Sequence, residues 1–417
     1  MKKTAMLNKK SAFVCAVCIA AALLVCGACV SGKAAPAKPG KSGPSLDNPR
    51  LQSALAKLRR GEPVSVVALG GSITTGYQAS PPDMSGWAGL VRTWWDTKAK
   101  ETGSEIIWHN SGASGTDSAY GAIRIQDHAL AYEPDVVILE FAINDQWLNP
   151  KVRRRSFEGA LRQLLDGSGR AVLLLALNQK GDVNAGQRQE QEPIGNHYGL
   201  ATLAWADWAK SALWNTYFTG SESIHPNNAG HANIAQGITD YLEAVWASLP
   251  DDSALTPADP ALPAPLVSSE FQHVRLISSD DAGAVLDDYM WDPANAILPG
   301  EWLTRGGKQL KGWTTADSDA ELQIRVRGKS VGVFIAESDQ FRNGEAWIEK
   351  PDGSVTPKIQ LNTYVSYRSG YYGNAYAEIA DNLDPGAPCI LHITVKNSPA
   401  KADGAVHVIG ALCTGVE

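Results

Sequence analysis

Ser72, Glu222 and His225 are three residues whose types and spacing could do chemistry together. A serine hydroxyl is a weak nucleophile until a base removes its proton, and histidine is the side chain that titrates near neutral pH. Because His225 precedes Pro226, it is held extended and outside the helix that follows. Glu222 lies three residues earlier, in a turn from which its carboxylate can reach the imidazole. The pattern predicts a nucleophile, a general base and an acid that orients the base. The alternative for Ser72 is a helix N-cap.

Three polar or small residues follow predicted strands and should therefore meet in space. Ser72 comes after a short apolar run and two glycines, which is typical of a buried strand that ends sharply. Gly112 and Asn144 lie in the small-residue turns after the next two predicted strands. Because the carboxyl ends of parallel strands share one edge of a sheet, we expect the three residues to converge there. The alternative for Gly112 is a simple turn glycine, and for Asn144 a turn or cap residue. The predicted strands cover residues 64–69, 105–110 and 135–141.

The surrounding sequence alternates between strand and helix patterns. Further strands are predicted at 171–177 and 201–205, and helices at 51–60, 86–101, 117–132, 152–165, 193–198 and 227–249. A polar segment, residues 178–192, is predicted to form a rim of the site. This alternation predicts a parallel sheet with helices on both faces.

A second domain is predicted after a segment rich in Pro, Ala, Asp and Ser. That segment, residues 250–266, is interpreted as a linker, and residues 267–417 as a β-sandwich or jelly-roll domain. Predicted strands cover residues 322–326, 330–335, 345–349, 389–395 and 405–412. Five tyrosines cluster in one loop-rich region and suit either core packing or a sugar-stacking surface: Tyr364, Tyr367, Tyr371, Tyr372 and Tyr376. The domain could be a separate binding module, or it could pack on the first domain and complete it.

The N-terminal residues 1–28 are typical of a signal peptide. Four lysines precede an apolar segment, residues 11–25, that is short for a membrane span. Gly27-Ala28-Cys29 resembles the lipobox of bacterial lipoproteins, although Cys26 stands where leucine is usual. We expect an exported protein, anchored through a lipid on Cys29 at the periplasmic or cell-surface face; plain secretion is the alternative. Residues 29–50 are predicted to be a flexible linker.

Composition excludes some functions and leaves two cysteines in the folded part. The net charge of −7 and the lack of a basic run interleaved with aromatics argue against nucleic-acid binding. No histidine or cysteine spacing indicates a metal site, and no cofactor is expected.

Cys389 and Cys413 are predicted to form a disulfide in an oxidising compartment. A hairpin centred near residues 397–404 would place them roughly opposite each other.

Four blocks together resemble those of the SGNH hydrolases, the superfamily also called GDSL-type esterases. They occur in family order within residues 60–248, and the hydrolase domain is assigned to residues 51–249. Thr74 stands where a Gly-x-Ser-x-Gly elbow needs its second glycine, so the motif is not that of the α/β-hydrolases. The blocks are Gly70-Gly71-Ser72-Ile73-Thr74, Asn110-Ser111-Gly112-Ala113-Ser114-Gly115, Ala142-Ile143-Asn144-Asp145 and Glu222-Ser223-Ile224-His225-Pro226-Asn227.

The resemblance implies a flavodoxin-like, three-layer α/β/α fold and a serine esterase. It makes Ser72 the nucleophile, His225 the base and Glu222 the acid, where the family commonly has aspartate. It also implies an oxyanion hole formed by the Ser72 and Gly112 N–H groups and the Asn144 side chain.

The substrate expected from export and the appended β-domain is an acylated carbohydrate, from which the enzyme removes O-acetyl or other short acyl groups. The alternatives are a lipase, a thioesterase or another acyl hydrolase, an acetyltransferase, and a non-catalytic polysaccharide-binding lipoprotein. Membrane contact is expected only through the lipid anchor.

Overall fold

The computed structural model describes residues 44–167, 169–182, 187–249, 261–295, 297–298, 301–302, 304–305, 308–364, 372–396 and 404–416. The predicted signal peptide, Cys29 and most of the first linker lie outside the described residues, as do Tyr367 and Tyr371. Residues 44–417 belong to one compact unit. Among the described residues, no helix combines the length and the apolar character that a membrane crossing requires.

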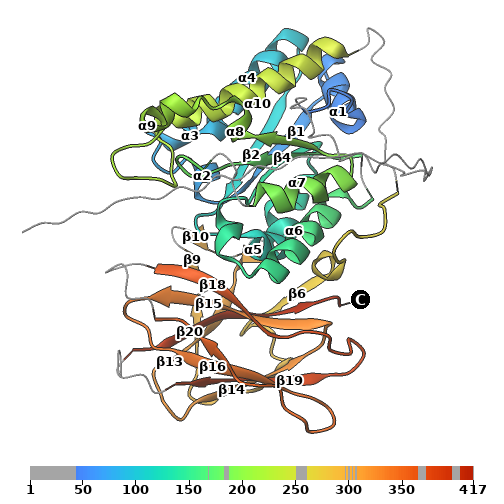
Figure 1. Ribbon diagram of the computed structural model, residues 1–417. Helices are drawn as coiled ribbons and strands as arrows, with labels where there is room; N and C mark the ends of the chain where they lie inside the picture. The colour runs from blue at the N-terminus through green and yellow to red at the C-terminus, as the bar shows by residue number, and fades with distance from the viewer. Residues whose placement is uncertain are drawn as a thin grey trace, which may run out of the picture. The chain divides into compact units, whose positions relative to one another are not determined.

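A five-stranded parallel sheet forms the centre of the first domain (Figure 1). Its order, β2-β1-β3-β4-β5, is the flavodoxin-like order, so the predicted fold class is confirmed. Every residue of β1 is buried, as expected for a strand covered on both faces. The strands are β1 Val64–Gly70, β2 Ile106–Gly112, β3 Val136–Glu140, β4 Ala171–Ala176 and β5 Ala201–Ala204.

Helices cover both faces of this sheet because successive strand residues point to opposite sides. Val66 and Ala68 belong to the core under α1 Pro49–Arg59, α4 Trp87–Thr102 and α10 Asn228–Ser248 (Figure 1). Val67 and Leu69 belong to the opposite core, under α5 Ser118–His128, α6 Pro150–Leu165 and α7 Arg188–His197. The helix predicted at 193–198 starts earlier, so residues 188–192 are helical rather than part of a loop. Shorter helices are α2 Ser72–Thr75, α3 Pro82–Ser85, α8 Trp205–Trp208 and α9 Trp214–Tyr217, with 3-10 turns η1 Leu130–Tyr132, η2 Asn144–Trp147, η3 Ser211–Leu213 and η4 Glu270–Gln272.

Two antiparallel sheets form the second domain and share one apolar core. One follows the order β18-β15-β20-β13-β8 with β6 also paired to β20, and the other the order β17-β16-β19-β14-β7. The strands are β6 Val274–Ile277, β7 Val285–Asp287, β8 Asp292–Asn295, β13 Lys311–Thr315, β14 Glu321–Val326, β15 Ser330–Ser338, β16 Gly344–Glu349, β17 Ile359–Leu361, β18 Tyr372–Ala380, β19 Cys389–Val395 and β20 Val406–Thr414. Two short ribbons pair β9 Ile297–Leu298 with β10 Glu301–Trp302, and β11 Thr304–Arg305 with β12 Lys308–Gln309.

The hairpin expected between the two cysteine strands is wrong. Cys389 lies on β19, which pairs with β14 and β16, whereas Cys413 lies on β20 in the other sheet, paired with β15 and β6. Both thiols are buried and free, so the predicted disulfide is not formed in this structure. Burial raises the pKa of the Cys413 thiol to about 11, which keeps it protonated and unreactive.

An apolar cluster joins helices of the hydrolase domain to strands of the all-β domain. Tyr120 of α5 packs edge-on against Phe334 of β15, with ring centroids 4.9 Å apart. The ring of Tyr376 lies 4.9 Å from Phe334 and 6.4 Å from Phe271. This tyrosine therefore packs between the domains and does not form a sugar-stacking surface.

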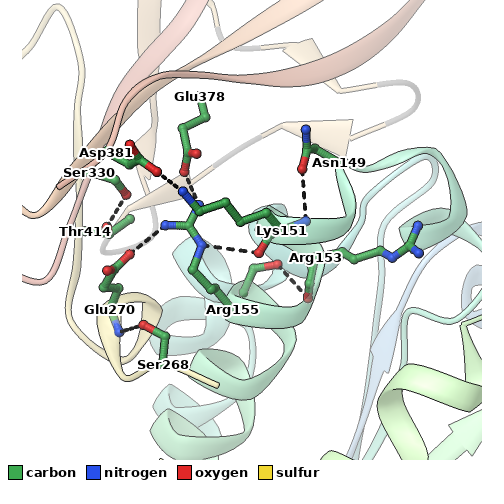
Figure 2. Close-up of polar contacts among 11 residues, drawn as sticks. Asn149, Lys151, Arg153, Arg155, Ser268, Glu270, Ser330, Glu378, Asp381 and Thr414 are labelled. Carbon is green, nitrogen blue, oxygen red and sulfur yellow. Dashed lines mark hydrogen bonds and ion pairs between the residues drawn. The ribbon is translucent and has the colours of Figure 1, made fainter. Parts of the chain in front are cut away.

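Ion pairs also join helix α6 to the all-β domain (Figure 2). Arg155 of α6 is 7% exposed and binds two glutamates at once, Glu270 at 2.7 Å and Glu378 of β18. Lys151, one turn earlier on α6, pairs with Asp381 just after β18. The two domains are thus held together by charge as well as by apolar packing.

The described part of the second predicted linker, residues 261–266, is bound to the hydrolase domain rather than free. The Glu158 carboxylate accepts the backbone N–H groups of Leu266, Val267 and Ser268 at 2.6, 2.6 and 2.7 Å. Arg162 donates to the Pro263 carbonyl at 2.8 Å.

Candidate active site

Ser72 lies at the sharp turn between β1 and the short helix α2. Gly71 is the N-cap of α2 and Ser72 its first residue, a position at which the backbone N–H has no acceptor within the helix. A Cβ atom at Gly70 would lie 2.3 Å from Thr74 Oγ1, and one at Gly71 would lie 2.9 Å from Asn144 Nδ2. Only glycine leaves room for this turn, which is the physical reason for the pair before the serine.

The structure brings Ser72 and His225 together from positions 153 residues apart in the chain. Ser72 Oγ lies 2.9 Å from His225 Nε2, within hydrogen-bond reach of a general base. The Ser72 side chain is 7% exposed overall. Tyr77 was not expected at the site from its place in the sequence. Its ring centroid lies 4.5 Å from that of His225, with the two rings tilted by 58°.

Glu222 lies beside His225 but binds chiefly to its own turn. Its Oε2 is 3.6 Å from His225 Nδ1, which is an ion-pair distance rather than a hydrogen bond. Its Oε1 accepts the backbone N–H groups of Ser223, Ile224 and His225 at 2.9, 2.8 and 3.3 Å. Partial burial raises the pKa of Glu222, but these N–H groups and the charge of His225 outweigh it, so the pKa lies below its usual value. The acid therefore stays ionised and fixes the backbone that carries the histidine.

Asn144 begins the 3-10 turn η2 and lies against the nucleophile turn. Its Nδ2 donates to the Thr116 carbonyl at 2.8 Å and lies next to the Cα of Gly71. The amide group can offer its second N–H elsewhere, because an asparagine amide carries two. Asn144 therefore lies against Gly71, the residue before Ser72.

Gly112 does not supply the N–H group that the resemblance implied. Its N–H donates to Asn110 Oδ1 at 3.0 Å, and Asn110 Nδ2 donates to the Thr74 carbonyl at 2.9 Å. A Cβ atom at Gly112 would lie 2.5 Å from the backbone nitrogen of Thr75. Gly112 allows β2 and α2 to pack closely. Its N–H group is taken by the Asn110 side chain, and the sequence does not show where that side chain points.

Gly115, in the same block, is exposed and has a left-handed backbone with φ +71°. The next residue, Thr116, holds the Asn144 amide through its carbonyl. A Cβ atom at Gly115 would lie 3.7 Å from Nδ2 of Asn374, a residue of β18. The all-β domain thus reaches the glycine block beside the site, as in the second of the two alternatives for this domain.

Two carboxylates flank the contact between Asn144 and Thr116, since Asp145 follows Asn144 and Asp117 follows Thr116. Asp145 is 1% exposed and accepts the Ser118 N–H and the Gln191 side-chain amide, both at 2.8 Å. Burial, followed by the nearby charge of Asp117, raises the pKa of Asp145 well above its usual value. Burial also raises the pKa of Asp117 to about 6, against hydrogen bonds from the backbone of Tyr120 and Ala119. Asp145 anchors the loop of Asn144 and does not face the serine's partners.

Within the described part of the chain, no three His, Cys, Asp or Glu side chains are arranged to hold a metal ion. The residues that the structure brings together are Ser72, His225, Glu222 and Asn144. What they can do is remove the serine proton and place N–H groups beside the oxygen that would become negative.

Comparisons with known proteins agree with the sequence blocks. Residues 68–232 match the model of the GDSL-like lipase/acylhydrolase family. No curated protein matches the chain in sequence.

Solved structures match both domains in fold. A two-domain esterase active on acetylated mannans is 20% identical, with a TM-score of 0.70 over 88% of this chain and 95% of that one. A structure of such an esterase co-crystallized with mannopentaose gives the same identity and TM-score over 90% of this chain and 96% of that one. Residues 68–232 therefore form a GDSL-like lipase/acylhydrolase domain, the domain of a serine ester hydrolase, and an all-β domain follows it.

Proposed function

We propose that this enzyme removes O-acetyl groups from a carbohydrate through an acetyl-enzyme on Ser72. The single observation that carries the proposal is the 2.9 Å contact between Ser72 Oγ and His225 Nε2. Ser72 Oγ attacks the ester carbonyl while His225 Nε2 takes its proton. The Glu222 carboxylate, 3.6 Å from Nδ1, stabilises the imidazolium that forms.

The reaction is completed by three further proton transfers through the same imidazole. His225 gives its proton to the sugar oxygen as the C–O bond breaks, and the acetyl group stays on Ser72. A water molecule then loses a proton to His225 and attacks the acetyl carbonyl. His225 returns that proton to Ser72 Oγ as the bond from Oγ to the acetyl carbon breaks, which releases acetate and restores the Ser72 hydroxyl.

The oxyanion of each tetrahedral intermediate needs hydrogen-bond donors at the same edge of the sheet. The Ser72 N–H at the start of α2 and the second N–H of Asn144 Nδ2 are two such donors. The glycine block can add a third from Gly115, because Gly115 is exposed and its neighbour Thr116 holds the Asn144 amide.

A carbohydrate substrate is supported by the fold shared with the acetylmannan esterase across both domains. Export, with lipid attachment at Cys29, is part of the same proposal, since an acetylated glycan outside the cell needs an exported enzyme. Its support is the sequence of residues 1–29.

The test measures acetate released from a panel of acetylated glycans, together with turnover of a chromogenic acetyl ester and a long-chain ester. Ser72→Ala should lower kcat by roughly 10⁴-fold or more while leaving the fold intact. Ser221→Ala, at an exposed serine near the acid, is the matched control and should keep full activity. A serine-reactive phosphonate should label Ser72 alone. Preference for the long-chain ester with no acetate from any glycan would refute the proposed substrate, and an active Ser72→Ala would refute the mechanism.

A further inference from the structure

A buried arginine binds the ends of two strands directly beneath the nucleophile turn. Arg124 of α5 is 1% exposed. Its Nη2 donates to the Gly70 carbonyl and its Nη1 to the Ser111 carbonyl, both at 2.7 Å. Gly70 ends β1 and immediately precedes the Gly71-Ser72 turn, while Ser111 belongs to the end of β2. One guanidinium therefore links the nucleophile turn to the glycine block.

The same guanidinium reaches the segment that holds Asn144. Arg124 Nη2 lies 3.4 Å from Thr116 Oγ1, and the Thr116 carbonyl accepts the Asn144 amide at 2.8 Å. Arg124 also faces His128 Nδ1 at 3.3 Å. Burial first, and then the charge of Arg124, lower the pKa of His128 to about 4, so this imidazole is neutral near pH 7 and accepts a hydrogen bond.

A buried glutamate makes the corresponding link from the other neighbour of β1. Glu140, the last residue of β3, is 2% exposed. The backbone N–H groups of Ile143, Gly71 and Ala142 donate toward its carboxylate, with Ile143 N 3.4 Å from Oε1. Glu140 therefore ties the nucleophile turn to the segment that leads into Asn144.

Arg124 and Glu140 both contact one peptide group. The Gly70 carbonyl and the Gly71 N–H belong to the same peptide unit, so Arg124 holds its oxygen and Glu140 faces its nitrogen. The Ala113 N–H also donates to the Gly70 carbonyl, at 2.8 Å. Burying a guanidinium and a carboxyl group is costly, and a strand end needs only backbone partners, so these two buried side chains at one peptide exceed what the sheet requires.

We propose that Arg124 and Glu140 are positioning residues, which fix the peptide before Ser72 and thereby set Ser72 against Asn144. The inference rests on the proposed function, in which those two residues act on the oxyanion. A misplacement of about 1 Å at such a site costs roughly 100-fold in rate, so loss of the contacts of either side chain should lower kcat.

Arg170 is a control of matched chemistry. Arg170 directly precedes β4, and its guanidinium also donates to backbone carbonyls. These are the carbonyl of Pro134, just before β3, at 3.0 Å and that of Leu164 in α6. Arg170→Lys should therefore lower stability without lowering kcat.

The experiment measures kcat, KM and the rate of phosphonate labelling for Arg124→Lys, Glu140→Gln and Arg170→Lys, with thermal unfolding of each protein. We expect Arg124→Lys and Glu140→Gln to lower kcat and the labelling rate together, by roughly 10- to 100-fold, with KM changed less than about threefold. If Arg124→Lys does not fold, Glu140→Gln and Thr116→Val carry the test, because both keep the side-chain volume. Folded variants with kcat within about twofold of wild type, or an equal loss in Arg170→Lys, would overturn the inference. An inactive wild type would instead refute the proposed function, since the inference concerns ratios to an active enzyme.

Discussion

Replacing Glu140 by glutamine should make the enzyme more stable in alkaline solution while it lowers activity. Glu140 is 2% exposed, and its carboxylate faces backbone N–H groups but no described cation in hydrogen-bond contact. Burial raises the pKa of Glu140 from 4.5 to about 7, against hydrogen bonds from Ile143, Gly71 and Ala142. Glutamine has nearly the same shape and stays neutral at all pH values.

The sign and size of the effect follow from linkage. The folded protein holds the Glu140 proton at pH values at which the unfolded chain has already lost it. The free energy of unfolding therefore falls as the pH rises from the unfolded pKa of 4.5 through the folded pKa of about 7. A shift of that size is worth about 3 kcal/mol, and the glutamine variant does not lose it.

The assay is urea unfolding of wild type and Glu140→Gln at about pH 4 and about pH 8. The unfolding free energy of Glu140→Gln minus that of wild type should increase by about 3 kcal/mol from the lower to the higher pH. Other carboxylates with a raised pKa, among them Asp117 and Asp145, titrate in both proteins and cancel in the difference. If this difference stays constant with pH, or decreases as the pH rises, the reasoning is refuted.

The remaining predictions concern the domain contact and the thiols. Arg155→Met leaves two partly buried glutamates without their shared cation and should destabilise the protein by roughly 3–5 kcal/mol in urea unfolding. Lys151→Met changes a side chain that is 57% exposed, so it should cost at most about 1 kcal/mol in the same assay. Similar losses in the two variants would contradict the burial argument. Cys389 and Cys413 should react with a thiol reagent only after denaturation and show two free thiols by mass spectrometry; a disulfide in protein from an oxidising compartment would argue against the free thiols seen here.

Much of the hydrolase domain could be predicted from sequence because its signals are local. The buried run before Ser72 and the helix after Asn227 have lengths and boundary residues that the chain alone reveals. The convergence of Ser72 with Asn144 follows from strand order in a parallel sheet. His225 could be placed because Pro226 and Glu222 restrict it locally.

What could not be predicted depends on partners distant in sequence or on side-chain direction. The N–H of Gly112 is taken by Asn110, which sequence spacing does not reveal. Arg124 resembles any basic residue of an amphipathic helix, and Glu140 resembles a polar strand end, because burial of their charges is a property of the assembled sheet. Cys389 and Cys413 could not be assigned to different sheets from the pattern of short strands alone.

The apolar cluster around Tyr120 and Phe334 bears on how such a protein can arise and be re-engineered. The cluster includes Leu148 and Val152 from the hydrolase side and Leu412 from the strand side, each almost fully buried. A gene fusion that attached an unrelated sandwich to this hydrolase would leave these side chains facing water, an aggregation hazard. The unit that recombination can move intact is therefore the pair of domains, and a replacement of the all-β domain must include the α5–α6 surface together with the strands that cover it.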